Sequence, residues 1–318
     1  MVYRIGIIGF GKIAQDQHLP AIRDNPNLEL TAVASQRGLT PDEARHTFTD
    51  YREMLRDVPD LDAVAICTPP QVRHAIARDA LEAGKHVLLE KPPAATLSEL
   101  EDLRRIAGEM HKVVFTTWHA QYNRGVDVAR DTLAGRTVRR LLVTWKEDVR
   151  HWHPGQQWIW QAGGFGVFDP GINALSIVTK IMPTPVFIRK ADLQFPANRD
   201  APIAANLSFS TGSEDADLQA VFDWRQTGPQ TWDIEIDCVG GPLLKLSHGG
   251  SRLEVDGSLV VEEDSHEYPA IYRRFETLLA ESRSEVDDAP FRLVADAFMI
   301  GRRVQVDAFE DDPGKAGH

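Results

Sequence analysis

Short apolar runs alternate with stretches of helical spacing along the first part of the chain. Buried strands are predicted over residues 2–8, 28–35, 63–68, 87–90 and 113–117. Helices are predicted from a glycine turn at residue 9 to about residue 24, and over 71–83 and 96–110. Strands that alternate with helices indicate a parallel sheet wound on both faces. Residues 1–120 are therefore predicted to form an α/β domain.

The remaining sequence has longer alternating strands, separated by turns rich in Gly, Pro, Asn and Asp. Strands are predicted over residues 138–149, 204–209, 216–224 and 234–239. Helices are predicted over residues 122–134, 172–181, 268–280 and about 291–306. This pattern predicts an α+β domain over residues 121–318, built on a mostly antiparallel sheet.

Composition excludes several classes of partner. Lys and Arg number 35 and Asp and Glu 47, so the formal net charge is −12. An acidic chain lacks the cations that neutralise phosphates, so we expect no nucleic-acid partner and no anionic membrane partner. No apolar run approaches the roughly 18 residues of a membrane span, and no secretory signal pattern is found. The two cysteines are far apart, and a reducing cytoplasm is the expected compartment.

The motif Gly9-x-Gly11-x-x-Ala14 follows the first predicted strand and opens a helix. In that setting the glycines allow a tight turn and a close approach to a pyrophosphate, which the helix N-terminus then binds. The first domain is therefore predicted to be a Rossmann domain. A plain strand–helix turn is the alternative. The predicted cofactor-binding residues of this turn are Gly9, Gly11, Lys12 and Ile13.

The end of the second strand carries no carboxylate to bind a ribose 2′-hydroxyl. It carries Ser35, Gln36 and Arg37, and an Arg binds a 2′-phosphate in a bidentate manner. We therefore predict NADP as the preferred cofactor, with NAD also accepted, although Arg37 could instead be an ordinary solvated side chain. Further cofactor contacts are predicted at Thr68, Pro69 and Glu90.

Lys91 follows the fourth predicted strand in the motif Glu90-Lys91-Pro92. Ligands of open α/β sheets bind beyond the carboxyl ends of the strands, where this Lys could reach cofactor and substrate. The glycine turn, this motif and the run from Gly163 to Asp169 together resemble the glucose–fructose oxidoreductase/inositol dehydrogenase (Gfo/Idh/MocA) family over essentially the whole chain. The segments 145–150, 153–158 and 168–175 resemble its bacterial L-arabinose/D-galactose 1-dehydrogenases more narrowly.

The resemblance implies that an aldose is oxidised at C1 to its lactone with NAD(P)+. The wider family has a His four residues after the Asp, whereas this chain has Asn173, as the narrower group does. Such an oxidation needs a base for the hydroxyl proton, and Asp169 is our candidate, with Lys91 beside it. Asn173 would share a helix face with Asp169 and bind the anomeric oxygen.

Asp169 has a competing interpretation, because an Asp before Pro170 is also a good helix N-cap. Sequence alone does not decide whether Asp169 or Lys91 takes the proton.

Substrate-binding residues are predicted mainly in the second domain. Glu147 follows Leu141, Val143 and Trp145 on one strand face, so its carboxylate is expected to be partly buried unless that end of the strand is solvated. The resemblance assigns Glu147 and His153 to sugar binding. Further candidates, each with a structural alternative, are His119, Trp152 and Trp232.

Tryptophan is unevenly distributed, since six of the seven lie between Trp145 and Trp232. Such rings stack on sugars, although most of them are expected to pack in the core. His151 and His153 lack a third ligand at a suitable spacing, so no metal site is predicted.

The preferred function is an NAD(P)-dependent aldose 1-dehydrogenase with a small-molecule aldose as its partner. The alternatives are a non-catalytic regulator that binds dinucleotide and sugar, and an inositol or diol dehydrogenase. The sequence does not rank L-arabinose against D-galactose. A homo-oligomer is possible, but no sequence feature identifies its interface.

Overall fold

The computed structural model describes residues 2–212, 216–264 and 266–311. The described residues form two compact units. Among them, the first contains residues 2–119 together with 266–288, and the second contains residues 120–212, 216–264 and 289–311. The domain boundary predicted near residue 120 stays a prediction, and the structure adds that residues 266–288 pack with the first unit.

The first unit is built on a parallel sheet with the strand order β3-β2-β1-β4-β5-β6. The strands are β1 (Tyr3–Ile8), β2 (Leu28–Ala34), β3 (His46–Phe48), β4 (Ala63–Ile66), β5 (His86–Glu90) and β6 (Val114–Thr117). Strand order reverses between β1 and β4, so the right-handed crossovers place helices on both faces of the sheet. This is the predicted Rossmann arrangement.

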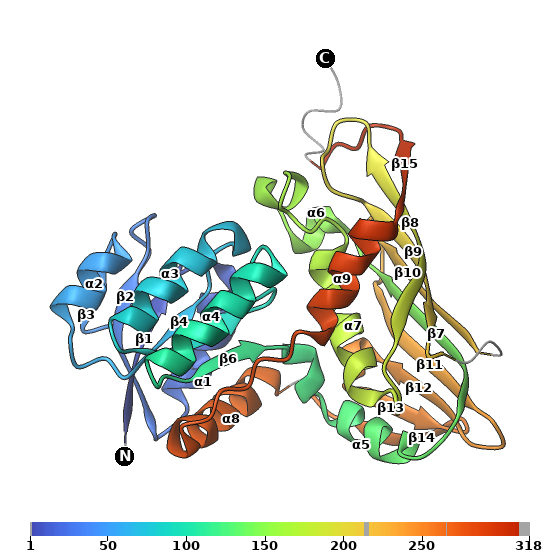
Figure 1. Cartoon of the computed structure of the whole chain (residues 1–318), viewed down its shortest axis with the longest axis horizontal. Coiled ribbons are helices and arrows are strands. Elements are labelled where there is room, and N and C mark those ends of the chain that lie inside the picture. The colour runs from blue at the N-terminus through green and yellow to red at the C-terminus, as the bar shows by residue number, and fades with distance from the viewer. Residues whose placement is uncertain (1, 213–215, 265, 312–318) are drawn as a thin grey trace. The chain divides into compact units, whose positions relative to one another are not determined.

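The first unit's helices are η1 (Ala14–His18, a π-helical turn), α1 (Leu19–Arg23), α2 (Tyr51–Asp57), α3 (Pro70–Glu82), α4 (Leu97–Glu109) and α8 (Glu267–Glu281). Helices α3 and α4 pack against each other, as do α1 and α8 (Figure 1). The predicted capping box of α4 is present, with the Thr96 hydroxyl accepting from the Glu99 N–H and the Glu99 carboxylate accepting from the Thr96 N–H.

The second unit contains a nine-stranded sheet with the order β14-β13-β12-β11-β7-β10-β9-β8-β15. Its strands are β7 (Val138–Lys146), β8 (Phe187–Pro196), β9 (Ala204–Ser210), β10 (Asp217–Asp223), β11 (Thr231–Cys238), β12 (Leu243–Ser247), β13 (Arg252–Val255), β14 (Ser258–Glu262) and β15 (Arg302–Val306). Only the β7–β10 and β8–β15 pairings are parallel among the pairings of the described strands, which confirms a mostly antiparallel sheet.

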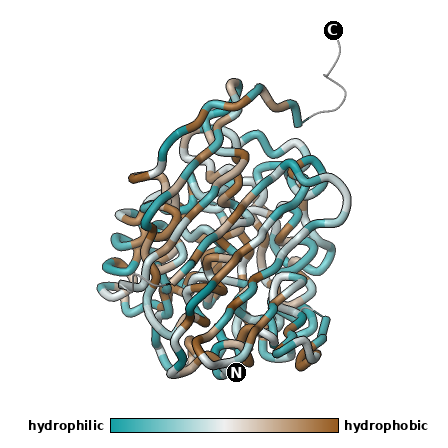
Figure 2. The backbone as a smooth tube through the Cα atoms, turned by 90° about the vertical axis from the view of Figure 1, so that its right-hand side faces the viewer, coloured by the Kyte–Doolittle hydropathy of each residue, from teal (hydrophilic) through white to brown (hydrophobic). Residues whose placement is uncertain are grey.

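The second unit's helices are α5 (Arg124–Leu133), α6 (Val149–Trp152), η3 (Gln157–Trp160), α7 (Phe168–Ile181), η4 (His248–Gly250) and α9 (Ala289–Ile300), and the short η2 (His119–Tyr122) precedes them. Helix α7 contacts α5, α9 and the sheet. Side chains alternate between buried and partly exposed along the central strands. Figure 2, which colours the backbone by hydropathy, shows hydrophobic and hydrophilic residues alternating along the chain. Alternation of this kind is typical of a sheet with one covered face.

Several predicted boundaries were wrong. The strand predicted over 138–149 ends at Lys146, and the chain turns into α6 three residues later. The helix predicted to reach residue 306 ends at Ile300, and β15 follows Gly301 to complete the sheet edge. The alternative interpretation of Asp169 as an N-cap is also wrong, because α7 already begins at Phe168. The helices in the part of the chain that the structure describes are all too short or too polar to cross a bilayer.

Gly171 allows α7 to pack closely on the sheet. A Cβ at this position would lie 2.9 Å from the Phe222 ring, whereas a Cβ at Gly108 in α4 would meet nothing within 4 Å. We expect Gly171→Ala to lower the free energy of unfolding by about 1–3 kcal/mol, the usual cost of overpacking. The control Gly108→Ala should raise it by up to about 1 kcal/mol, because Ala is the better helix former. Urea denaturation of both variants measures the difference, and equal effects would contradict the packing argument.

Candidate active site

The glycine turn after β1 has the geometry of an anion-binding site. Gly9 has φ +91°, and a Cβ there would lie 2.9 Å from both the backbone N and Cγ2 of Thr68. Only glycine fits this position without strain. The helix that follows leads into η1, and the first N–H groups of a helix have no intrahelical acceptor. These groups are therefore available to a pyrophosphate.

Three of the predicted cofactor residues lie around this turn or at the end of β2. Arg37 is exposed, and its Nη2 would lie 3.6 Å from a Cβ at Gly11, so the guanidinium reaches the glycine turn. Ser35 is buried at the end of β2. Thr68 Oγ1 is buried and has no hydrogen-bond partner among the described residues, which leaves a hydroxyl beside the turn for a ligand.

The other predicted cofactor residues have different surroundings. Lys12 is exposed and forms an ion pair with Asp16 one turn later. Ile13 is exposed, Gln36 is exposed, and Pro69 is the N-cap residue of α3. Glu90 is buried, and its carboxylate is engaged by groups of the protein itself. Cofactor contacts at these positions stay predictions.

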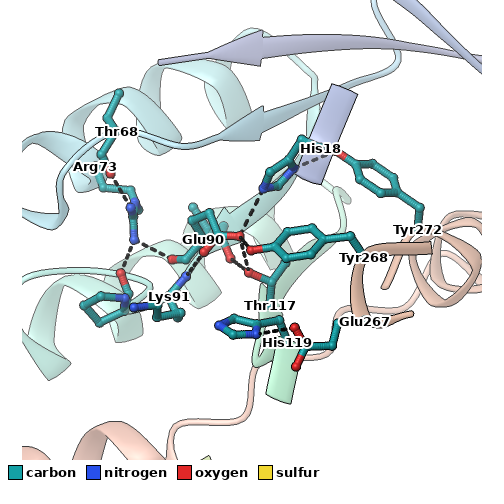
Figure 3. A network of polar contacts seen from close by, with 12 residues as sticks. His18, Thr68, Arg73, Glu90, Lys91, Thr117, His119, Glu267, Tyr268 and Tyr272 are labelled. Atoms are coloured by element: carbon teal, nitrogen blue, oxygen red, sulfur yellow. Dashed lines mark hydrogen bonds and ion pairs between the residues drawn. The ribbon is translucent and has the colours of Figure 1, made fainter. Parts of the chain in front are cut away.

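Lys91 follows β5 directly, beside a densely bonded polar cluster in the first unit (Figure 3). The backbone N–H of Lys91 donates to Glu90 Oε2 at 2.9 Å. Its peptide bond to Pro92 is cis. The position of Lys91 at the carboxyl end of a parallel strand is the one in which such sheets bind ligands.

His119 belongs to the same cluster of the first unit. Its Nδ1 donates to Glu267 Oε2 at 2.8 Å, and its ring stacks on Tyr268 at 5.8 Å. Burial lowers the pKa of His119, but the charge and hydrogen bond of Glu267 raise it by more, so its pKa lies above 6.5. The predicted role of His119 in substrate binding stays a prediction.

In the second unit, Glu147 is 3% exposed and lies on the covered face of the sheet with Trp145, as the period-two pattern predicts. Its two carboxylate oxygens accept hydrogen bonds from two indoles. Trp224 Nε1 donates to Oε1 at 3.2 Å, and Trp232 Nε1 donates to Oε2 at 2.9 Å. The carboxylate is therefore held in one orientation, and its remaining lone pairs can accept hydroxyl groups.

His153 lies between Glu147 and Asp169. Its Nε2 is 3.7 Å from Glu147 Oε1, and its Nδ1 is 3.7 Å from Asp169 Oδ2. Both distances exceed hydrogen-bond length. Asn173 lies one helical turn after Asp169, and both His153 Nδ1 and Asn173 Oδ1 are buried without a hydrogen-bond partner among the described residues. Buried polar atoms in this state need a partner, which a polar ligand would supply.

Aromatic rings lie beside the polar cluster of Glu147, His153, Asp169 and Asn173. Trp232 stacks on Trp145 at 5.9 Å, and Trp152 contacts Trp232 at 5.1 Å while remaining 37% exposed. His153 contacts Trp224 at 5.3 Å. Flat apolar surface next to hydroxyl-binding groups is suited to a sugar.

Several residues of these clusters were not predicted. In the first unit, the Glu90 carboxylate is contacted by His18 and Tyr268, its backbone carbonyl by Arg73, and His18 by Tyr272. In the second unit, Trp224 donates a hydrogen bond to Glu147. The uneven distribution of tryptophan was a signal for Trp224. In the described ranges, no group of three or more His, Cys, Asp or Glu side chains is arranged to hold a metal ion.

The two indole hydrogen bonds predict how a substitution of Glu147 changes the stability of the protein. Replacement by Gln turns one acceptor into an NH2 group that faces an indole N–H, so one buried donor loses its partner. We expect Glu147→Gln to lower the free energy of unfolding by about 1–3 kcal/mol. Glu235→Gln on the partly exposed side of β11 is the matched control and should change it by less than about 0.5 kcal/mol. Chemical denaturation measures both, and equal changes would contradict the bonding scheme.

Several known proteins are similar to this chain in sequence and fold. A family model described as "Oxidoreductase family, NAD-binding Rossmann fold" matches residues 3–118. The galactose 1-dehydrogenase of Pseudomonas fluorescens is 46% identical over 97% of this chain and 99% of its own. The crystal structure of D-galactose-1-dehydrogenase from Rhizobium etli has a TM-score of 0.92 and 51% identity over 97% of this chain and 98% of its own.

A 3-ketoreductase from Actinomadura kijaniata, solved with NADP and TDP-benzene, has a TM-score of 0.80. Its identity is 21%, over 96% of this chain and 100% of that chain, so it shows the shared fold alone. The first two relatives match nearly the whole chain, including both units. The chain therefore belongs to the glucose–fructose oxidoreductase/inositol dehydrogenase family of NAD(P)-binding oxidoreductases.

Proposed function

We propose that this protein is an aldose 1-dehydrogenase that oxidises the C1 hemiacetal of D-galactose and L-arabinose to the lactone, with NADP+ preferred over NAD+. The observation that carries the proposal is the polar cluster of Glu147, His153, Asp169 and Asn173 in the second unit. There His153 Nδ1 and Asn173 Oδ1 are buried without a hydrogen-bond partner among the described residues, and His153 lies 3.7 Å from the carboxylates of both Glu147 and Asp169. The two galactose 1-dehydrogenases related to the whole chain support it.

The residues that would hold the cofactor all lie in the first unit. Gly9, Gly11 and the start of the following helix would bind the pyrophosphate, and Ser35 with Arg37 would bind the 2′-phosphate. When bound, the nicotinamide accepts the hydride that leaves C1.

The reaction also releases the proton of the C1 hydroxyl, for which Asp169 is the proposed base. Its position inside the first turn of α7 supports this role, because the N-cap position is taken by Val167. A carboxylate near a helix N-terminus is stabilised as the anion, the form that accepts a proton. Asn173 would hold the anomeric oxygen, and Glu147 with His153 would bind ring hydroxyls. Lys91 would stabilise the negative charge that develops on that oxygen.

A panel of substrates tests the proposal. The absorbance of the reduced nicotinamide is followed with NADP+ or NAD+ and L-arabinose, D-galactose, D-xylose, D-glucose or myo-inositol. We expect rapid turnover with the first two sugars. Turnover with myo-inositol alone would favour an inositol dehydrogenase. Cofactor binding without any turnover would favour a non-catalytic regulator, and either result would refute the proposal.

Loss of the base should reduce turnover strongly. We expect Asp169→Ala and Asp169→Asn to lower kcat by about 10²-fold or more, the usual contribution of a general base. Asp200→Asn, at an exposed position of the same unit, is the control and should leave kcat unchanged. Steady-state kinetics measures the ratio. A near-normal kcat in the Asp169 variants would exclude Asp169 as the base.

Arg37 should discriminate between the two cofactors. Arg37→Ala removes a charge-assisted contact worth about 1.5–3 kcal/mol, so we expect the Kd of NADPH to rise about tenfold or more while that of NADH changes little. Arg23→Ala, at another exposed position of this unit, should affect neither. Fluorescence titration with the reduced cofactors measures both affinities. Equal losses would show that Arg37 does not bind the 2′-phosphate.

A further inference from the structure

The carboxylate of Glu90 is the centre of a buried hydrogen-bond network in the first unit (Figure 3). His18 Nε2 donates to its Oε1 at 3.0 Å, and Tyr268 donates its hydroxyl proton to the same oxygen at 2.7 Å. The hydroxyl of Thr117 lies 3.2 Å from this oxygen. The other oxygen, Oε2, accepts the backbone N–H of Lys91. Glu90 thus joins Lys91 to three segments that are distant in the sequence.

His18 and Glu90 form a buried ion pair. Burial lowers the pKa of His18, but Cys67, Tyr272 and Glu90 raise it by more, so it lies well above 6.5. Burial raises the pKa of Glu90, but hydrogen bonds from His18 and Tyr268 and the charges of His18 and His119 lower it to about 2. In the imidazolium form, the second ring nitrogen donates to the Tyr272 hydroxyl at 2.8 Å.

Arg73 holds the backbone on both sides of Lys91. Its buried guanidinium donates to the carbonyl groups of Glu90 and Pro92, and also to that of Thr68 after β4. The backbone of Lys91 is therefore held by Arg73 through its two neighbours and by Glu90 through its own N–H. With the backbone held, the starting point of the Lys91 side chain is set, and only that side chain has to be ordered when its ammonium group stabilises a developing charge.

The position of His18 adds a connection to the glycine turn. It is the last residue of η1, the π-helical turn in the helix that follows Gly9 and Gly11. Its side chain crosses from this helix to the end of β5, where Lys91 lies. No other side chain among the described residues is shown to join this helix to Glu90.

We propose that His18 is a positioning residue for Lys91, acting through the Glu90 carboxylate. The role given to Lys91 rests on the proposed function, whereas the connection from His18 to Lys91 rests on the contacts of the first unit. Without His18, Glu90 loses the donor that balances its charge, and a buried carboxylate then moves or takes up a proton. Either change alters the acceptor of the Lys91 N–H.

The first test needs no catalysis. Protein labelled at histidine and at the lysine amide nitrogens is titrated by NMR without ligand. We expect the His18 imidazole to stay charged at pH 7 and the Lys91 amide signal to shift in His18→Ala. The matched control is His74→Ala, because His74 donates to Asp102 at 2.9 Å in a similar pair of the same unit. A neutral His18 at pH 7, or an unmoved Lys91 amide, would overturn the proposal.

The second test measures cofactor binding and kinetics together. We expect His18→Ala to lower kcat and kcat/KM about 10–100-fold, because displacement by about 1 Å has effects of this size, and to leave the Kd of NADPH within about threefold. His18→Gln keeps a donor toward Glu90 and should recover part of the loss. A parallel fall in NADPH affinity would instead show that His18 acts on the glycine turn.

A double-mutant cycle separates positioning from general destabilisation. If His18 acts through Lys91, adding His18→Ala to Lys91→Ala should change kcat by less than about threefold. A further 10–100-fold loss would overturn the proposal. Should His18→Ala fail to fold, Tyr272→Phe removes only the hydroxyl beside His18 Nδ1 and should give a smaller kcat loss that also disappears in Lys91→Ala. If the wild-type protein oxidises no sugar, the proposed function fails, and the NMR titration still decides the role of His18.

Discussion

A carboxylate removed from water must be surrounded by donors, and Glu90 in the first unit and Glu147 in the second are both in that state. Glu90 and Glu147 are each 3% exposed. Because an unpaired buried charge costs several kcal/mol, the groups that bond to these oxygens have little freedom to move. Glu90 fixes the N–H of Lys91 in this way. Glu147 fixes two indoles, and His153 lies beside it. Lys91 is thus bonded to one buried carboxylate, and His153, which is proposed to bind the sugar, lies beside the other.

Features encoded by local pattern could be predicted from the sequence. The strand–turn–helix around Gly9 and the capping box at Thr96 each depend on residues a few positions apart, and both were confirmed. The burial of Glu147 followed from the alternation of apolar residues along one strand. The roles of Asp169, Asn173 and Lys91 in catalysis, by contrast, stay predictions.

Features that depend on distant segments could not be predicted. Helix α7 begins at Phe168, and the N–H of its N-cap residue Val167 donates to the carbonyl of Pro202 at 2.7 Å, a contact with a segment far along the chain. The contacts of Arg73 with three carbonyl groups, and of Tyr268 with Glu90, join residues between 5 and 178 positions apart. Strand β15 was interpreted as helix, because five residues at a sheet edge carry too short a pattern to outweigh the helix before them.

Residues 266–288 pack with the first unit although residues 120–265 separate them from it in the sequence, and this order matters while the chain is being translated. Tyr268 and Tyr272 of the Glu90 network both lie on α8, which leaves the ribosome only after the whole of residues 120–265. At roughly 5–20 residues per second, that interval lasts on the order of ten seconds. During it, Glu90 lacks the Tyr268 donor, and the face of the sheet next to α1 lacks its covering helix. The nascent chain therefore carries an unfinished nucleotide-binding half, and a chaperone has time to bind it before the last helices emerge.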